Sequence, residues 1–251
     1  MVRKPDGAPA VTAATAKLLD AYRAELLRWN RQISLVSRRD PEQVADTLIR
    51  QCLDAFGLWW SASGAALAQG GALRVFDLGS GGGLPGFVWL AQLAAQGVAL
   101  EATLVEPRAK RAWFLERLGQ LPGAPRFAVA AARWGEIVPG GAGPALAADT
   151  PILFTLKALR LPEPAILAGL GALPGPARPA AGAIVELVRF QPATGASAKG
   201  LARELEVPAP GDVFAADGLA CRAGDSRLLT PARRRAEAAG LFVSRHEVVT
   251  I

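Results

Sequence analysis

The sequence predicts an α/β fold, in which a mostly parallel sheet of seven strands follows an N-terminal helical extension. The central observation is a short apolar run, Leu73–Leu78, that breaks into a glycine-rich turn and continues as an apolar stretch at helical density. Similar apolar runs recur along a chain of 251 residues, and a hydrophobic content of 51% is ample for a core. The seven strands are expected at residues 73–78, 102–106, 127–130, 151–159, 182–190, 222–230 and 241–249.

The helical extension precedes the first strand. Thr12 is expected to cap a helix that runs to about Ile33, because the apolar side chains of this stretch recur at steps of three and four residues. Asp40 and Pro41 are expected to cap and open a second helix. The chain is therefore divided into a disordered start at 1–11, a helical cap at 12–62 and an α/β domain at 70–251, with a Gly- and Ala-rich loop within 138–150 and a helix carrying Arg233 to Arg235.

The glycine-rich turn indicates a nucleotide-like ligand. Gly81 to Gly86 has the spacing G-x-G-x-x-G, which alone is weak evidence in a chain with 27 glycines. Asp77 adds a carboxylate at the end of the strand, where it would repel a pyrophosphate but suit a ligand that carries an ammonium and a sulfonium. This favours S-adenosylmethionine over NAD.

The next strand supports a nucleotide site. Residues 102–105 lead into Glu106, whose carboxylate is expected to accept hydrogen bonds from two ribose hydroxyls. Two alternatives stay open: a dinucleotide could occupy the site, or Asp77 and Glu106 could merely cap helices beside an ordinary strand-to-helix turn.

Composition narrows the class of protein. The formal net charge of +6 and the pI near 10 favour an anionic partner, nucleic acid first, although an arginine-rich composition can have the same effect without binding. No apolar stretch approaches membrane-spanning length and no signal-peptide pattern opens the chain, so a cytoplasmic protein without membrane contact is expected. Two distant cysteines and a single histidine predict neither a disulfide nor a metal site.

Five segments resemble the RsmG (GidB) methyltransferases: Tyr22–Val36, Asp40–Glu42, Arg50–Asp54, Phe76–Gly86 and Leu104–Leu115. The Leu-Pro-Gly ending of the glycine loop and the Trp-Asn pair of the upstream helix carry the likeness, which extends from about residue 18 to residue 136. The resemblance implies a Rossmann-like class I S-adenosylmethionine-dependent methyltransferase that methylates guanine N7 in small-subunit (16S) ribosomal RNA. Its partner would be ribosomal RNA or the small ribosomal subunit, and a monomer is expected.

The resemblance also implies roles for individual residues. Lys157, Arg50 and Asp54 would face the acceptor as catalytic residues, and Lys110, Arg111 and Arg189 would contact RNA. A solvated helix face explains Lys110 and Arg111 equally well, and core packing is an alternative for Trp134. The cofactor-binding residues would be Asp77, Gly79, Ser80, Gly81, Gly83, Leu84, Glu106, Arg133 and Trp134.

Three departures from the family pattern lie on the acceptor side. Gln51 stands where the family has histidine, Lys157 stands where it has arginine, and Arg189-Phe190 replaces Lys-Gly. They leave open a methyltransferase with another acceptor or, further off, a non-catalytic RNA-binding protein. Transfer to guanine N7 needs no general base, because this nitrogen carries a lone pair at neutral pH, and neither cysteine lies in a motif typical of a nucleophile.

Overall fold

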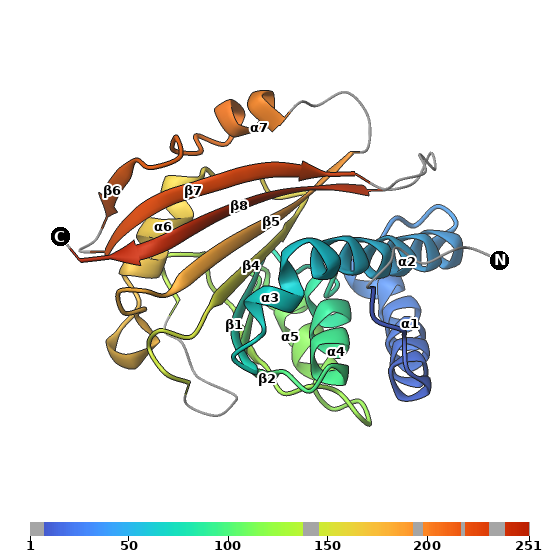
Figure 1. Cartoon of the computed structure of the whole chain (residues 1–251). Coiled ribbons are helices and arrows are strands. Elements are labelled where there is room, and N and C mark those ends of the chain that lie inside the picture. The colour runs from blue at the N-terminus through green and yellow to red at the C-terminus, as the bar shows by residue number, and fades with distance from the viewer. Residues whose placement is uncertain (1–7, 138–145, 193–197, 217–218, 231–238, 251) are drawn as a thin grey trace.

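The computed structural model describes residues 8–137, 146–192, 198–216, 219–230 and 239–250. Its described strands form one eight-stranded sheet in the order β3-β2-β1-β4-β5-β8-β7-β6 (Figure 1). The first five strands of that order pair in parallel, and the last three pair antiparallel. The strands are β1 Ala72–Leu78, β2 Ala99–Val105, β3 Ala128–Ala130, β4 Ile152–Lys157, β5 Ile184–Pro192, β6 Val213–Ala216, β7 Leu219–Leu229 and β8 Ala239–Val249.

All seven expected strands are present, and β6 is an addition at the sheet edge. The sequence analysis missed β6 because it has only four residues, two of them alanine, which has a low preference for strands. The expected disordered start, the loop within 138–150 and the Arg233 to Arg235 helix fall partly or wholly outside the described residues.

The first two helices begin where the sequence places them. In α1, Ala13–Ile33, the side chain of Thr12 accepts a hydrogen bond from the Thr15 N–H. The second helix, α2, begins at Pro41, but Asp40 makes no side-chain cap hydrogen bond, so the predicted capping contact is wrong. Helix α2 spans Pro41–Trp59. The remaining helical segments are the π-helical turn η1 Trp60–Gly64, α3 Ala65–Leu67, α4 Gly86–Ala95, α5 Ala109–Leu118, α6 Glu163–Gly171, the 3₁₀ turn η2 Gly175–Ala177 and α7 Ala198–Glu204.

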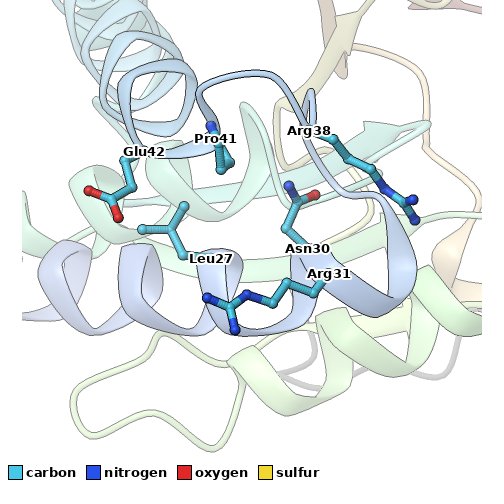
Figure 2. Close-up of a pocket in the computed structure, with 6 residues that line it drawn as sticks. All are labelled: Leu27, Asn30, Arg31, Arg38, Pro41 and Glu42. Carbon is cyan, nitrogen blue, oxygen red and sulfur yellow. The ribbon is translucent and has the colours of Figure 1, made fainter.

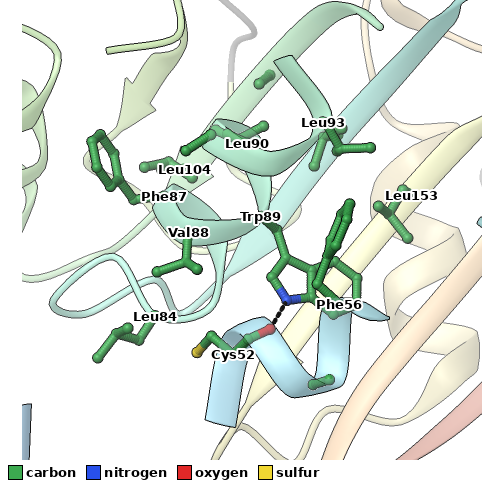
Figure 3. Packing of buried hydrophobic residues seen from close by; sticks show 14 of the residues in the cluster. Cys52, Phe56, Leu84, Phe87, Val88, Trp89, Leu90, Leu93, Leu104 and Leu153 are labelled. Carbon is green, nitrogen blue, oxygen red and sulfur yellow. Dashed lines mark hydrogen bonds between the residues drawn. The ribbon is translucent and has the colours of Figure 1, made fainter. Parts of the chain in front are cut away.

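Helices cover both faces of the sheet, each over its own buried cluster (Figure 1). On one face, side chains of α1, α2, α4 and α5 pack with alternate residues of the central strands. Trp89 of α4 lies at the middle of this cluster, stacked on Trp59 and donating its indole N–H to the Cys52 carbonyl at 2.9 Å (Figure 3). On the other face, α6 packs on the residues that point the opposite way.

The parallel strands bring their carboxyl ends to one edge. Leu78 at the end of β1 pairs with Val105 of β2 and with Leu156 of β4. Ligands of open α/β sheets bind at this edge, so the glycine loop and Glu106 lie where the fold predicts a site.

Within the described residues, no helix is both long and apolar enough to cross a membrane.

Candidate active site

The loop between β1 and α4 has a backbone that requires glycine. Gly79, Gly81 and Gly83 have φ values of 73°, 55° and 88°, in the left-handed region that disfavours side chains. The N–H groups of Gly79 and Ser80 both donate to the Val105 carbonyl, at 2.9 and 3.1 Å. The loop is therefore fixed against the end of β2.

The Asp77 carboxylate is buried in β1, directly before this loop. Its side chain is 1% exposed, and Oδ1 accepts a hydrogen bond from Thr155 Oγ1 of β4 at 2.6 Å. A Cβ on Gly86 would lie 2.7 Å from Asp77 Cγ, so only glycine fits above the carboxylate. Burial raises the pKa of Asp77 to about 6, and the Thr155 hydrogen bond only partly opposes this shift. Asp77 Oδ2 makes no hydrogen bond within the described chain, and the contact of Asp77 with a ligand ammonium stays a prediction.

Glu106 joins the loop to α5. Its Oε2 accepts the Gly81 N–H at 3.0 Å, and its Oε1 accepts the Arg108 N–H at 2.9 Å. The side chain is 3% exposed and lies at the carboxyl end of β2. Each carboxylate oxygen keeps a further lone pair, so Glu106 retains acceptor capacity toward hydroxyl groups.

The N-terminal helix holds the outer side of the glycine loop. Tyr22, fully buried, donates its hydroxyl to the Gly82 carbonyl at 2.7 Å across 60 residues of sequence. A Cβ on Gly82 would lie 3.1 Å from Leu26 Cδ1, so α1 packs directly on the loop backbone. Asn30 extends the contact, because its Oδ1 accepts the N–H groups of Leu35 and Val36 at 2.7 and 2.8 Å. The cap is thus part of the site.

These contacts are the functional features that sequence reasoning missed. Tyr22 and Asn30 sit on the buried face of α1, and Thr155 sits in the apolar β4. Polar side chains on otherwise apolar faces are the signal that could have identified them, because a buried polar group needs a partner.

Four other predicted cofactor residues differ in burial and in their contacts. Ser80 is buried and donates its hydroxyl to the Asp77 carbonyl at 2.9 Å, while Leu84 is buried in the larger cluster. Arg133 is exposed. Trp134 packs edge-on against Phe76 and Phe154 and donates Nε1 to the Ile166 carbonyl at 2.8 Å, so its ring fills the core, which was one of the two alternatives.

The three predicted catalytic residues come from two elements, α2 and β4. Arg50 and Asp54 are exposed and one helical turn apart, on the face of α2 opposite to its buried residues Cys52 and Phe56. Lys157 ends β4 and is half-buried, and its charge lowers the pKa values of Cys52 and Asp77, although burial raises both more strongly. Lys157 therefore lies on the buried side of α2.

Arg189 requires a correction among the predicted RNA contacts. It is 2% exposed on β5, paired with Leu156 on one side and Phe242 on the other. Burial lowers the pKa of Arg189, while the Glu163 carboxylate raises it in part. Its guanidinium nitrogens are buried and make no hydrogen bond to the part of the chain that the structure describes. Because alternation along β5 turns this side chain toward the α6 face, it does not reach RNA in this structure.

The other two predicted RNA contacts differ from each other. Lys110 is exposed in the first turn of α5. Arg111 is half-buried and donates Nη2 to the Ser34 carbonyl at 3.0 Å, which ties α5 to the loop after α1. Arg111 therefore has a structural role beside the glycine loop.

A separate pocket of about 400 Å³ lies in the helical cap (Figure 2). It lies between α1 and the start of α2, and Figure 2 shows the Arg31 and Arg38 side chains pointing away from each other. The pocket is lined by Leu27, Asn30, Arg31, Arg38, Pro41 and Glu42.

In the described part of the chain, no three His, Cys, Asp or Glu side chains are grouped to hold a metal ion.

Comparison with known proteins identifies relatives of the segment that carries this loop. The family model GidB, described as rRNA small subunit methyltransferase G, matches residues 15–137. The ribosomal RNA small subunit methyltransferase G of Bordetella petrii is 34% identical over 131 residues, 52% of this chain and 48% of that protein. The protein of the same name from Bordetella avium is 31% identical over 154 residues, 61% of this chain and 62% of that protein.

The similarity is uneven along the chain, which spans about half the length of the curated relatives it matches. A solved rRNA methylase from Streptococcus thermophilus shares 12% identity, with a TM-score of 0.41, over 71% of this chain and 89% of that one. Residues 15–137, which run from α1 through the glycine loop to the segment after β3, match the GidB family model.

Proposed function

We propose that this protein is a cytoplasmic S-adenosylmethionine-dependent methyltransferase that methylates guanine N7 in small-subunit ribosomal RNA. One observation carries the proposal: the glycine loop is fixed beside Glu106 at the carboxyl edge of the sheet, within the segment that matches the GidB family. The relatives named above are ribosomal RNA small subunit methyltransferases.

The residues at this edge fit the cofactor. A Cβ on Gly81 would meet no atom of the described chain closer than 3.8 Å, so a ligand can approach the loop backbone there. Glu106 has the acceptor capacity that two ribose hydroxyls require. When bound, S-adenosylmethionine supplies an electrophilic methyl group on a positively charged sulfur.

The role of the chain in such a transfer is to position the acceptor. Guanine N7 needs no proton removed, so its placement in line with the methyl group supplies the catalysis, and such positioning can contribute roughly 7–11 kcal/mol. Lys157, at the carboxyl end of β4, supplies a positive charge for the guanine or its phosphate. Tyr22 and Asp77 hold the loop that fixes the other reactant.

A different RNA acceptor is the second candidate. The acceptor side carries the departures from the family at Gln51, Lys157 and Arg189, and Arg189 is buried. Lysine also lacks the planar fork with which arginine binds a phosphate or a guanine edge through two hydrogen bonds. These differences alter the acceptor side and leave the glycine loop unchanged.

Methylation of ribosomal RNA that lacks its native modifications tests both candidates. We expect the wild-type protein to transfer labelled methyl groups from S-adenosylmethionine and to yield N7-methylguanosine after nuclease digestion. Glu106→Gln should lose most of this transfer, and Glu116→Gln, an exposed change on α5, should retain it. A labelled nucleoside other than N7-methylguanosine would support the second candidate, and no transfer to any RNA by folded protein would overturn both.

A further inference from the structure

An aromatic surface on α5 lies beside the candidate active site and takes no part in the contacts that hold the glycine loop. Trp113 of α5 is 41% exposed, the only aromatic residue among the large exposed hydrophobic side chains of the described chain. The helix packs on the core through residues 112, 114, 115 and 118 instead. Core packing therefore does not explain Trp113, and exposed tryptophan is typical of binding surfaces.

Trp113 is the centre of an ordered group, here called the tryptophan platform: Trp29, Trp113, Arg28 and Arg117. The two indole rings meet edge to face, with centroids 4.7 Å apart. The Arg117 guanidinium carbon lies 5.2 Å from the Trp29 ring centroid and 5.3 Å from that of Trp113, and the corresponding Arg28 carbon lies 5.5 Å from Trp29. These are cation–π distances, so the arginines and the rings order one another.

Glu25 fixes the platform from α1. Its Oε2 accepts the Trp29 indole N–H at 2.9 Å and lies 3.3 Å from Arg117 Nη2, while Oε1 lies 3.3 Å from Arg28 Nη1. Burial raises the pKa of Glu25, but these hydrogen bonds lower it more, so the carboxylate stays ionised. Because one carboxylate pairs with two arginines, this group of three charged side chains keeps a net positive charge. The side chains that bind a partner are thus held in place before it arrives.

The tryptophan platform lies close to Glu106 of the candidate active site. Trp113 lies four residues into α5, about 6 Å along the helix axis from its first residue, and Glu106 lies just before that helix. Lys110, exposed one turn before Trp113, continues the positive surface toward the carboxyl edge of the sheet. A flexible polyanion with flat apolar groups matches this combination of charge and rings.

We propose that the tryptophan platform binds single-stranded RNA, with an unpaired base stacked on Trp113 and phosphates near Lys110 and Arg28. This rests on the proposed function, because the RNA is the substrate whose guanine enters the site at the adjacent edge. The platform adds affinity for the RNA strand and leaves the binding of the cofactor to the glycine loop.

The affinity of Trp113 variants for oligouridylate, at fixed salt, tests the proposal. We expect Trp113→Ala to weaken binding by about 5- to 150-fold, as for loss of one stacked base, and Trp113→Phe to retain most of the affinity. Val213→Ala, which trims another exposed apolar side chain on β6, should bind as the wild type. Affinity for S-adenosylmethionine should be the same in all four proteins. All four should be folded, with Trp113→Ala unfolding at a slightly lower temperature because it loses the ring contacts to Trp29 and Arg117.

Oligouridylate affinity of Trp113→Ala within twofold of the wild type would overturn the platform, as would failure of the wild type to bind the oligonucleotide. If Trp113→Ala impairs methylation of intact small subunits while its RNA affinity is unchanged, the platform binds a protein instead. The proposed function fails separately: wild-type protein that binds oligouridylate through Trp113 but transfers no methyl group would contradict the function and leave the platform in place.

Discussion

The cofactor edge and the acceptor edge of the site differ in how much of their geometry the protein fixes by itself. At the cofactor edge, Asp77, Glu106 and Tyr22 are buried. Glu106 and Tyr22 each make a hydrogen bond to the backbone of the glycine loop, and Asp77 accepts one from Thr155 of the neighbouring strand β4. At the acceptor edge, Arg50 and Asp54 are exposed on α2, and Lys157 is half-buried at the end of β4. The difference indicates that the first edge is preorganised, and under the proposed function we infer that the second is completed by its substrate.

The largest effect on the cofactor edge is expected from Gly86→Ala. The added methyl group would lie 2.7 Å from Asp77 Cγ in a fully packed region, so either the loop or β1 must move. We expect loss of cofactor binding and a decrease of about 3 kcal/mol in the free energy of unfolding, measured by denaturant titration. Gly70→Ala, where a Cβ would contact nothing within 4 Å, is the matched control and should leave both quantities unchanged.

Asp77→Asn should change how stability depends on pH. Because burial raises the pKa of Asp77 from 3.8 to about 6, the folded state binds more protons than the unfolded state between about pH 4 and pH 6. The free energy of unfolding of the wild type should therefore fall, relative to Asp77→Asn, by about 2–3 kcal/mol as pH rises through this window, and then level off above it. Parallel pH profiles of the two proteins would show that the carboxylate is not buried as described.

Tyr22→Phe tests whether the helical cap acts on the loop. The variant leaves the Gly82 carbonyl buried without its donor, so we expect a loss of about 1–3 kcal/mol in the free energy of unfolding together with weaker cofactor binding.

A second measurement uses the wild-type protein. Tyr22 is the only tyrosine in the chain, so 3-fluorotyrosine labelling gives a single ¹⁹F resonance. That resonance should shift when S-adenosylmethionine is added, and a resonance insensitive to the cofactor would separate the cap from the site.

The smallest stability effects are expected at the acceptor edge. Arg50→Ala and Asp54→Ala change exposed side chains of α2, so the free energy of unfolding should change by no more than about 0.5 kcal/mol. Methyl transfer to RNA should fall while cofactor affinity is retained. A stability loss comparable to that of Tyr22→Phe would show that these residues belong to the structural framework, which would remove the contrast between the two edges.

The cofactor edge was more predictable from the sequence than the acceptor edge. The glycine spacing and Glu106 follow local rules, since each lies at the end of a strand in a βαβ unit. The position of Asp77 under the loop depended on Thr155, 78 residues away, and the role of Tyr22 depended on Gly82. Contacts of this kind arise from tertiary packing, which residue spacing does not encode.

Arg189 illustrates the same limit on the other side of the sheet. A basic residue at the end of β5 reads as a ligand contact, because the carboxyl edge is where ligands bind. Which face of β5 it occupies is decided by register with β4 and β8, and that register buries it. A displacement by one residue would have placed it on the face toward α2.

Calorimetric titration with S-adenosylmethionine tests the central claim most directly. The account predicts that wild-type protein and Arg50→Ala bind the cofactor with equal affinity, and that Glu106→Gln binds it at least tenfold more weakly, as expected for loss of charge-assisted hydrogen bonds to ribose hydroxyls worth about 1.5–3 kcal/mol. Absence of binding by folded wild-type protein would contradict the assignment of the loop. Equal weakening by Arg50→Ala and Glu106→Gln would contradict the division between a preorganised cofactor edge and an acceptor edge completed by RNA.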